Sequence, residues 1–139
     1  MKNKAFLPLL ELIIMIGIFA AAAAVCLNAF AKADSISRAA KDLDFAVEAA
    51  ENAAEIIKYT RGDLDAAAEL LSGKTRSGSV VICFDGDWNP TDAENAVFKI
   101  EAVNYEGETL GKTDILVYSG KDLIYELTVG WQKEAQNGN

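Results

Sequence analysis

One carboxylate stands alone in the most apolar part of this sequence. The stretch from Phe6 to Ala31 contains a single formal charge, that of Glu11. A carboxylate among apolar side chains is costly, and where it occurs it usually has a partner group or a functional role. We therefore take Glu11 as the first candidate functional residue.

A second group of oxygen-bearing side chains follows a predicted strand. Asp85, Asp87 and Asn89 occupy alternate positions, which is the spacing of the first three ligands in an EF-hand calcium loop. The match then ends, because Pro90 stands where that loop requires Gly. Two interpretations remain open: a calcium site, and a solvated acidic loop whose Trp88 folds back onto a sheet.

Other kinds of chemistry lack their usual residues. The sequence contains no His, which is the commonest general base and metal ligand, and it has no Gly-rich phosphate loop. Residues 1–31 have a net charge of +1, from Lys2, Lys4 and Glu11. Because the net charge of the whole chain is -8, the remaining residues carry -9. An acidic body disfavours nucleic acid, which is recognised through basic patches. We expect neither an enzyme nor a protein that contacts nucleic acid directly, and no cofactor apart from the calcium considered above.

The segment that carries Glu11 is long enough to cross a membrane. As a helix, residues 6–31 would extend roughly 39 Å, against a bilayer core of about 30 Å. Lys2 and Lys4 precede it, so the positive-inside rule predicts a cytoplasmic N-terminus and an acidic body on the far side. Three interpretations compete: a signal peptide cleaved before Asp34, a plain single-pass anchor, and a helix in which Glu11 is functional.

The sequence around Glu11 resembles a known family. Leu9-Leu10-Glu11-Leu12-Ile13-Ile14, followed by a Gly and an Ala-rich stretch, is similar to the N-terminus of type IV pilins and of the pseudopilins of type II secretion. The resemblance implies that Glu11 neutralises the N-terminal amine of a neighbouring subunit during assembly. It implies as partners the membrane, copies of this chain or other pilin-like subunits, and a prepilin peptidase. Small residues would allow close packing of these helices, at Gly17, Ala20, Ala21 and Ala24.

The family pattern leaves the start of the mature chain open. Cleavage between Ala5 and Phe6 gives the residues that the family has at its processing site, but Glu11 is then the sixth residue. Cleavage between Phe6 and Leu7 makes Glu11 the fifth, as in the family, but places Phe before the cut. The leader is short and basic and has five or six residues. With the first cut, residues 1–5 are the leader, residues 6–31 the assembly helix, and residues 32–139 an extracytoplasmic domain.

Helical character continues beyond the apolar segment. Residues 33–59 contain neither Gly nor Pro, and apolar side chains recur at alternating gaps of four and three, which predicts one amphipathic helix that ends near Tyr59. The predicted stripe consists of Ile36, Ala40, Leu43, Val47, Ala50, Ala54 and Ile57, and it is widened by Phe45, Ala46, Ala49, Ala53 and Ile56. Because many of these residues are Ala, the stripe favours close packing on a sheet over a coiled coil.

The rest of the sequence predicts an α+β domain. A short helix is expected at 64–71, with Asp63 as its N-cap and Gly73 just beyond its end. Four strands are expected at 79–84, 96–105, 113–118 and 123–131, and they would form an antiparallel sheet packed on the long helix. This order of elements resembles the pilin architecture. The sequence thus favours a filament subunit, and a permanently anchored extracytoplasmic binding protein is the alternative.

Overall fold

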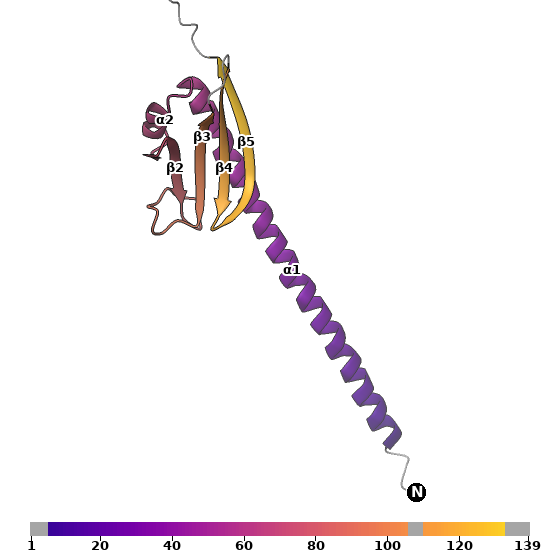
Figure 1. Ribbon diagram of the computed structural model, residues 1–139. Coiled ribbons are helices and arrows are strands. Elements are labelled where there is room, and N and C mark those ends of the chain that lie inside the picture. The colour runs from indigo at the N-terminus through magenta and orange to yellow at the C-terminus, as the bar shows by residue number, and fades with distance from the viewer. Residues whose placement is uncertain (1–5, 106–109, 133–139) are drawn as a thin grey trace, which may run out of the picture. The chain divides into compact units, whose positions relative to one another are not determined.

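The computed structural model of the chain describes residues 6–105 and 110–132. The chain divides into two compact units, Met1–Lys41 and Asp42–Asn139. Helix α1 (Phe6–Tyr59) is unbroken and contributes to both units (Figure 1). In the first unit α1 is the whole of the described structure, and its residues from Phe6 to Lys41 are all exposed.

The second unit consists of the end of α1, a short helix and a sheet. Helix α2 (Leu64–Leu70) is followed by β1 (Lys74–Arg76), β2 (Ser79–Phe84), β3 (Phe98–Tyr105), β4 (Leu110–Ser119) and β5 (Asp122–Gln132). Each strand pairs antiparallel with the next, in the order β1-β2-β3-β4-β5. The predicted α+β class with a long first helix is confirmed, and the sheet has five strands where about four were predicted.

The strand that the sequence did not predict is β1. Lys74, Thr75 and Arg76 are all exposed, so this strand has no buried face and therefore no apolar alternation to reveal it. Its place is fixed instead by a hairpin to β2, in which Ser77 and Gly78 both have positive φ angles of 49° and 84°. Two such residues between antiparallel strands are typical of the tight hairpin turns that match strand twist.

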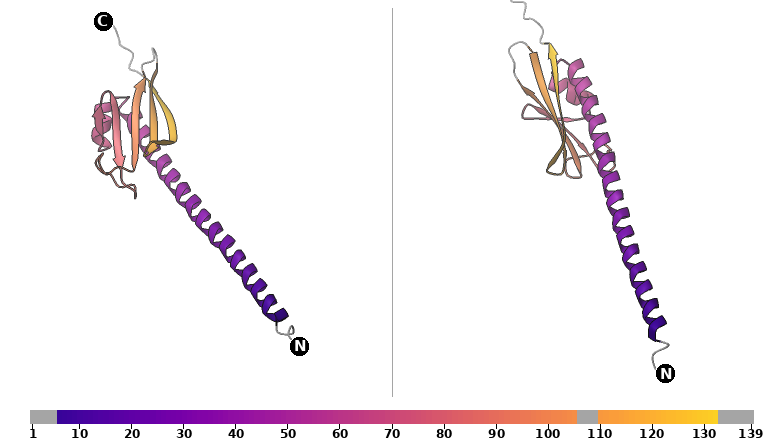
Figure 2. Two further views of the ribbon diagram at one scale, coloured as in Figure 1. Left: turned by 60° about the horizontal axis from the view of Figure 1, so that its bottom comes forward. Right: turned by 90° about the vertical axis from the view of Figure 1, so that its right-hand side faces the viewer.

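The part of α1 after Asp42 lies across one face of the sheet (Figure 2). Its contact side is made of small residues, because Ala46, Ala50 and Ala53 are completely buried. Without long side chains the helix comes close to the strands, whose buried side chains complete the core. These include Val80, Ile82, Ile100, Ala102, Ile115, Val117 and Val129.

The predicted stripe is only partly the buried one. Ala50, Ala54 and Ile57 are buried as expected, but Leu43 remains 43% exposed and Val47 is half-buried. The completely buried line runs through residues 46, 50, 53 and 57. It combines Ala50 and Ile57 of the stripe with Ala46 and Ala53, which were predicted to widen it. The sheet selects the side of α1 with the smallest side chains, because larger ones would hold the helix away from the strands.

The ends of α2 follow local rules. Asp63 caps α2 as predicted, and its Oδ1 accepts hydrogen bonds of 3.1 Å from the N–H groups of Asp65 and Ala66. At the other end Gly73 lies just beyond the helix as predicted, and Ser72 before it adopts the left-handed conformation, with φ of 54°. The N–H of Gly73 then donates to the carbonyl oxygen of Ala68 at 2.8 Å, which closes the helix.

Candidate functional site

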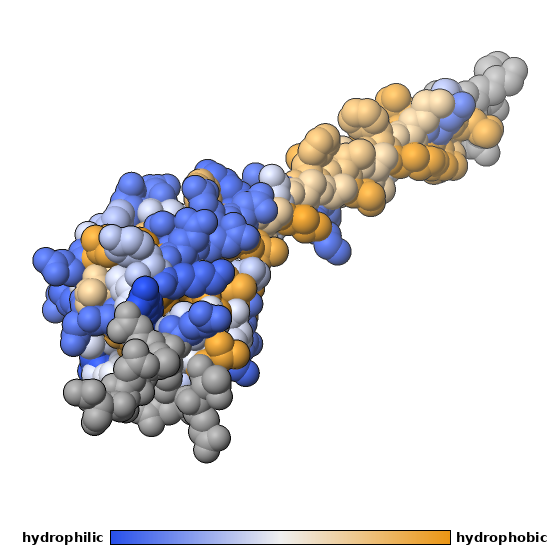
Figure 3. Space-filling view, turned by 90° about the horizontal axis from the view of Figure 1, so that it is seen from above, coloured by the Kyte–Doolittle hydropathy of each residue, from blue (hydrophilic) through white to orange (hydrophobic). Residues whose placement is uncertain are grey.

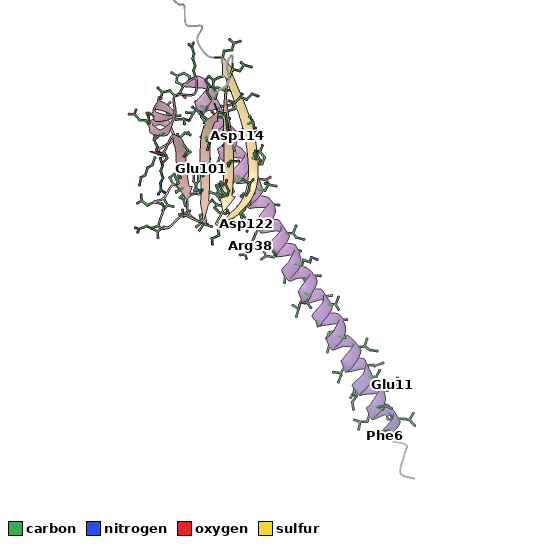
Figure 4. All side chains as sticks on the ribbon, in the orientation of Figure 1. Phe6, Glu11, Arg38, Glu101, Asp114 and Asp122 are labelled. Atoms are coloured by element: carbon green, nitrogen blue, oxygen red, sulfur yellow. The ribbon has the colours of Figure 1, made fainter. Side chains whose placement is uncertain are left out.

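Glu11 lies near the start of α1, like Phe6 (Figure 4). Phe6 and Leu7, the two candidate first residues of the mature chain, form part of the first helical turn, and Pro8 is suited to that position. Ala5 and the rest of the predicted leader fall outside the described residues. Between positions 6 and 31 the described helix contains no Lys or Arg, so any cation that neutralises Glu11 must come from outside this segment.

The predicted small-residue contact is a continuous strip along one side of α1. At 3.6 residues per turn, Gly17, Ala20, Ala21 and Ala24 lie within about 100° of one another around the helix axis. A β-carbon placed on Gly17 would meet nothing within 4 Å. By the same geometry Glu11 is about 120° away from Gly17. The carboxylate therefore lies outside the small-residue strip, on a neighbouring side of the helix.

The first part of α1 is long and apolar enough to cross a membrane. Its most apolar 18-residue window has a mean hydropathy of 2.5, and none of that window is buried within the structure. Figure 3 shows apolar side chains along the visible face of this segment. An exposed apolar surface of this length is typical of a segment covered by lipid or by other protein.

The acidic loop after β2 is organised around Asp85. Its Oδ1 accepts hydrogen bonds from the N–H groups of Asp87 at 2.9 Å and Asn89 at 3.0 Å, and the side-chain amide of Asn89 donates to both carboxylate oxygens at 3.4 Å. These bonds, first that from the N–H of Asn89 and then that from Asp87, lower the pKa of Asp85. The carboxylate thus acts as an acceptor that fixes the loop.

The three predicted calcium ligands are close in sequence, but the structure brings no further acidic side chain to them. Within residues 6–105 and 110–132, no three or more Asp, Glu, Cys or His side chains gather where they could hold a metal ion. Asn89 also directs its amide nitrogen toward Asp85, and a nitrogen donor cannot ligate a cation. Calcium binding therefore stays a prediction, to which this arrangement adds no support.

Trp88 folds back onto the sheet, as the alternative interpretation of this loop predicted. Its ring stacks on Phe98 with a centroid distance of 4.2 Å, and it also contacts Phe84 at 5.6 Å. The indole Nε1 donates to Oδ1 of Asp42 on α1 at 3.4 Å. Phe45, also on α1, completes the group with a centroid distance of 6.0 Å to Trp88.

Beside Trp88 lies a groove that sequence reasoning did not find. It has a volume of about 410 Å³ and lies among α1, α2, β2, β3 and the segment between these two strands. Its apolar lining includes Phe45, Ala49, Leu70, Leu71, Ile82, Phe84, Trp88, Pro90 and Ile100. We call it the Trp88 groove. The sequence offers one weak signal for it, a large aromatic side chain at Trp88 between the polar residues Asp87 and Asn89.

Comparisons of the chain with models of known families, with curated proteins and with solved structures found no match.

Proposed function

We propose that this chain is a pilin-like structural subunit, held in the cytoplasmic membrane with its N-terminus inside, that assembles into a filament through the first part of α1. One observation carries the proposal. A single unbroken helix, Phe6–Tyr59, combines an exposed apolar segment containing one carboxylate with an alanine-rich side packed on an antiparallel sheet.

The apolar segment supports assembly because it must stay covered wherever the protein goes. Large side chains such as Ile13, Ile18 and Phe19 are more than half exposed, and each such group costs about 1.5–3 kcal/mol in water. In the membrane, lipid covers them. In a subunit that leaves the bilayer, the same segments of other copies must cover these side chains. The small-residue strip around Gly17 allows those helices to approach closely.

Glu11 supports assembly for an electrostatic reason. A carboxylate in an apolar helix bundle requires a cation, and the segment itself supplies none. The free N-terminal amine of a processed neighbour would provide that cation at the right end of the helix. In a low-dielectric core the pair is favourable only when both members are present, because either one alone is buried without compensation.

The experiment is the variant Glu11→Ala in the full chain, with Asn28→Ala as a matched loss of a polar side chain from the same segment. We expect Glu11→Ala to abolish filaments, to keep the chain in the membrane and to leave its circular dichroism spectrum unchanged. Asn28→Ala should still assemble. Normal filaments from Glu11→Ala would refute the proposal.

A permanently anchored binding protein is the second candidate, and the Trp88 groove is the observation that favours it. The mass of the mature protein separates the two. A chain that begins at Phe6 or Leu7 supports the filament subunit, and an intact N-terminus supports the anchor. A chain that begins at Asp34 would indicate a cleaved signal peptide and would contradict both.

A further inference from the structure

We propose that the Trp88 groove binds a cationic, apolar segment of a partner protein, in which an aromatic or aliphatic side chain stands next to Lys or Arg. This inference does not depend on filament assembly, because every residue that lines the groove belongs to the unit Asp42–Asn139.

The size and lining of the groove fit a side chain and not only water. Its volume of about 410 Å³ lies in the range of about 300–1,000 Å³ that is usual for binding pockets. Large apolar side chains on its lining remain open to solvent, since Leu70 is 57% exposed and Phe45 is 38% exposed. A ligand that covers these two side chains therefore gains from the removal of apolar surface from water.

The charged side chains that line the groove favour a positively charged ligand. Its lining contains two ionisable side chains, Glu48 and Asp87, and no Lys or Arg. Lys74, on the neighbouring strand β1, is not part of the lining and forms an ion pair of 3.1 Å with Asp92. An anionic ligand would meet two like charges on the lining, whereas Lys or Arg beside the apolar group would be attracted to both carboxylates.

The aromatic wall is fixed before a ligand arrives. Trp88 is held by its stacking on Phe98 and by its hydrogen bond to Asp42. Its backbone has a φ of 62°, which is unusual for a large side chain and is maintained by the hydrogen bonds that Asp85 accepts on either side of it. A rigid ring requires little ordering on binding, so more of the contact energy contributes to affinity.

Binding can be measured with defined peptides on the full chain in detergent. Three fluorescein-labelled probes share one length: Lys-Phe-Lys-Leu-Lys, its anionic counterpart Glu-Phe-Glu-Leu-Glu, and the charge-only Lys-Gly-Lys-Gly-Lys. Fluorescence anisotropy should show saturable binding of the first peptide alone, weakened by added salt. Equal binding of the charge-only peptide, or no binding of the first at millimolar concentration, would overturn the proposal.

Variants place the binding in the groove. The double variant Glu48→Gln, Asp87→Asn should weaken binding of the cationic peptide by about tenfold or more, the equivalent of about 1.4 kcal/mol. Glu126→Gln removes an exposed carboxylate on β5 and should leave the affinity within about twofold. Leu70→Lys should abolish binding. Thermal melts check that each variant is folded, and unchanged affinity in the double variant would overturn the proposal.

Two further measurements distinguish a partner protein from a second copy of the chain, and peptide binding from filament assembly. If the double variant changes the sedimentation of the chain without peptide, the occupant is a second copy and the partner proposal is wrong. Glu11→Ala should not alter peptide binding, because Glu11 is not among the residues that line the groove. Loss of filaments with peptide binding retained would thus support both proposals, and each of them can fail separately.

Discussion

The side-chain amide of Asn104 donates a hydrogen bond of 2.8 Å to the carbonyl oxygen of Gly62, which ties β3 to the turn that ends α1. The oxygen of the same amide accepts a hydrogen bond of 2.6 Å from the hydroxyl of Thr113, a residue with no exposed surface. The indole of Trp131 fills the space beside Gly62. Polar and apolar contacts thus fix the end of α1 to the sheet at one place.

The polar part of this junction predicts the effect of Asn104→Ala. The substitution leaves the buried Thr113 hydroxyl and the Gly62 carbonyl without their partner, so the free energy of unfolding should fall by about 1–3 kcal/mol. Thr128→Ala is the control, because its hydrogen bond of 2.7 Å to Asp114 is exposed and its loss should cost no more than about 0.5 kcal/mol. Urea denaturation followed by circular dichroism measures both. Equal losses of unfolding free energy in the two variants would show that the hydrogen bonds of Asn104 contribute no more than one exposed hydrogen bond.

The apolar part predicts different effects of Ala at two glycines. Gly62 and Gly78 both have positive φ, at 78° and 84°, so either substitution should cost about 1–2 kcal/mol of backbone strain. A β-carbon at Gly78 would meet nothing within 4 Å, but at Gly62 it would overlap the indole of Trp131. Gly62→Ala should therefore cost about 1–3 kcal/mol more than Gly78→Ala. Thermal denaturation compares them, and identical melting temperatures would contradict the clash.

Much of this fold could be predicted because the signals are local. The strand at 79–84 has the predicted bounds, and α1 ends at Tyr59 as predicted. The strand is marked by a short apolar run rich in Val and Ile, and the helix by a period of apolar residues without Gly or Pro, and both signals lie within a few neighbouring residues. The exact side of α1 that packs on the sheet was harder to predict, because the widened stripe covers a broad part of the helix surface. The sheet packs on the part of it with the smaller side chains.

The Trp88 groove could not be predicted for a related reason. Phe45, Leu70 and Trp88 are far apart in the sequence, and only the packing of α2 and the β2–β3 segment beside α1 brings them together. The left-handed backbone at Trp88 has no sequence signature, since large side chains rarely adopt it. The sequence did identify Asp85, but the hydrogen bonds that it accepts give it the role of a loop organiser.

The hydrogen bonds of Asp85 predict how stability depends on pH. Its pKa in the folded chain is lowered from the ordinary value of 3.8, so its carboxylate stabilises the fold above about pH 3.8, and this contribution is lost as the pH falls through the lowered value. The difference in unfolding free energy between the wild type and Asp85→Asn should therefore be largest near neutral pH and shrink in acid. Urea denaturation from pH 7 to pH 3 measures it. A difference that stays constant would show that the pKa is not lowered.

The alanine side of α1 predicts that added bulk, rather than lost bulk, is the most damaging change to the core. Ala50 and Ala53 have no exposed surface. A Leu at position 53 would therefore push α1 away from the strands and separate the side chains that are now in contact between the helix and the sheet. Ala53→Leu should lower the free energy of unfolding by about 1–3 kcal/mol. Ala40→Leu adds the same atoms at an exposed position of the same helix and should change it by less than about 0.5 kcal/mol. Chemical denaturation of the detergent-held chain compares the two. If Ala53→Leu were as stable as Ala40→Leu, the helix would not be held close to the sheet, and Trp88, which contacts α1 through Asp42, would lose its support as one wall of the groove.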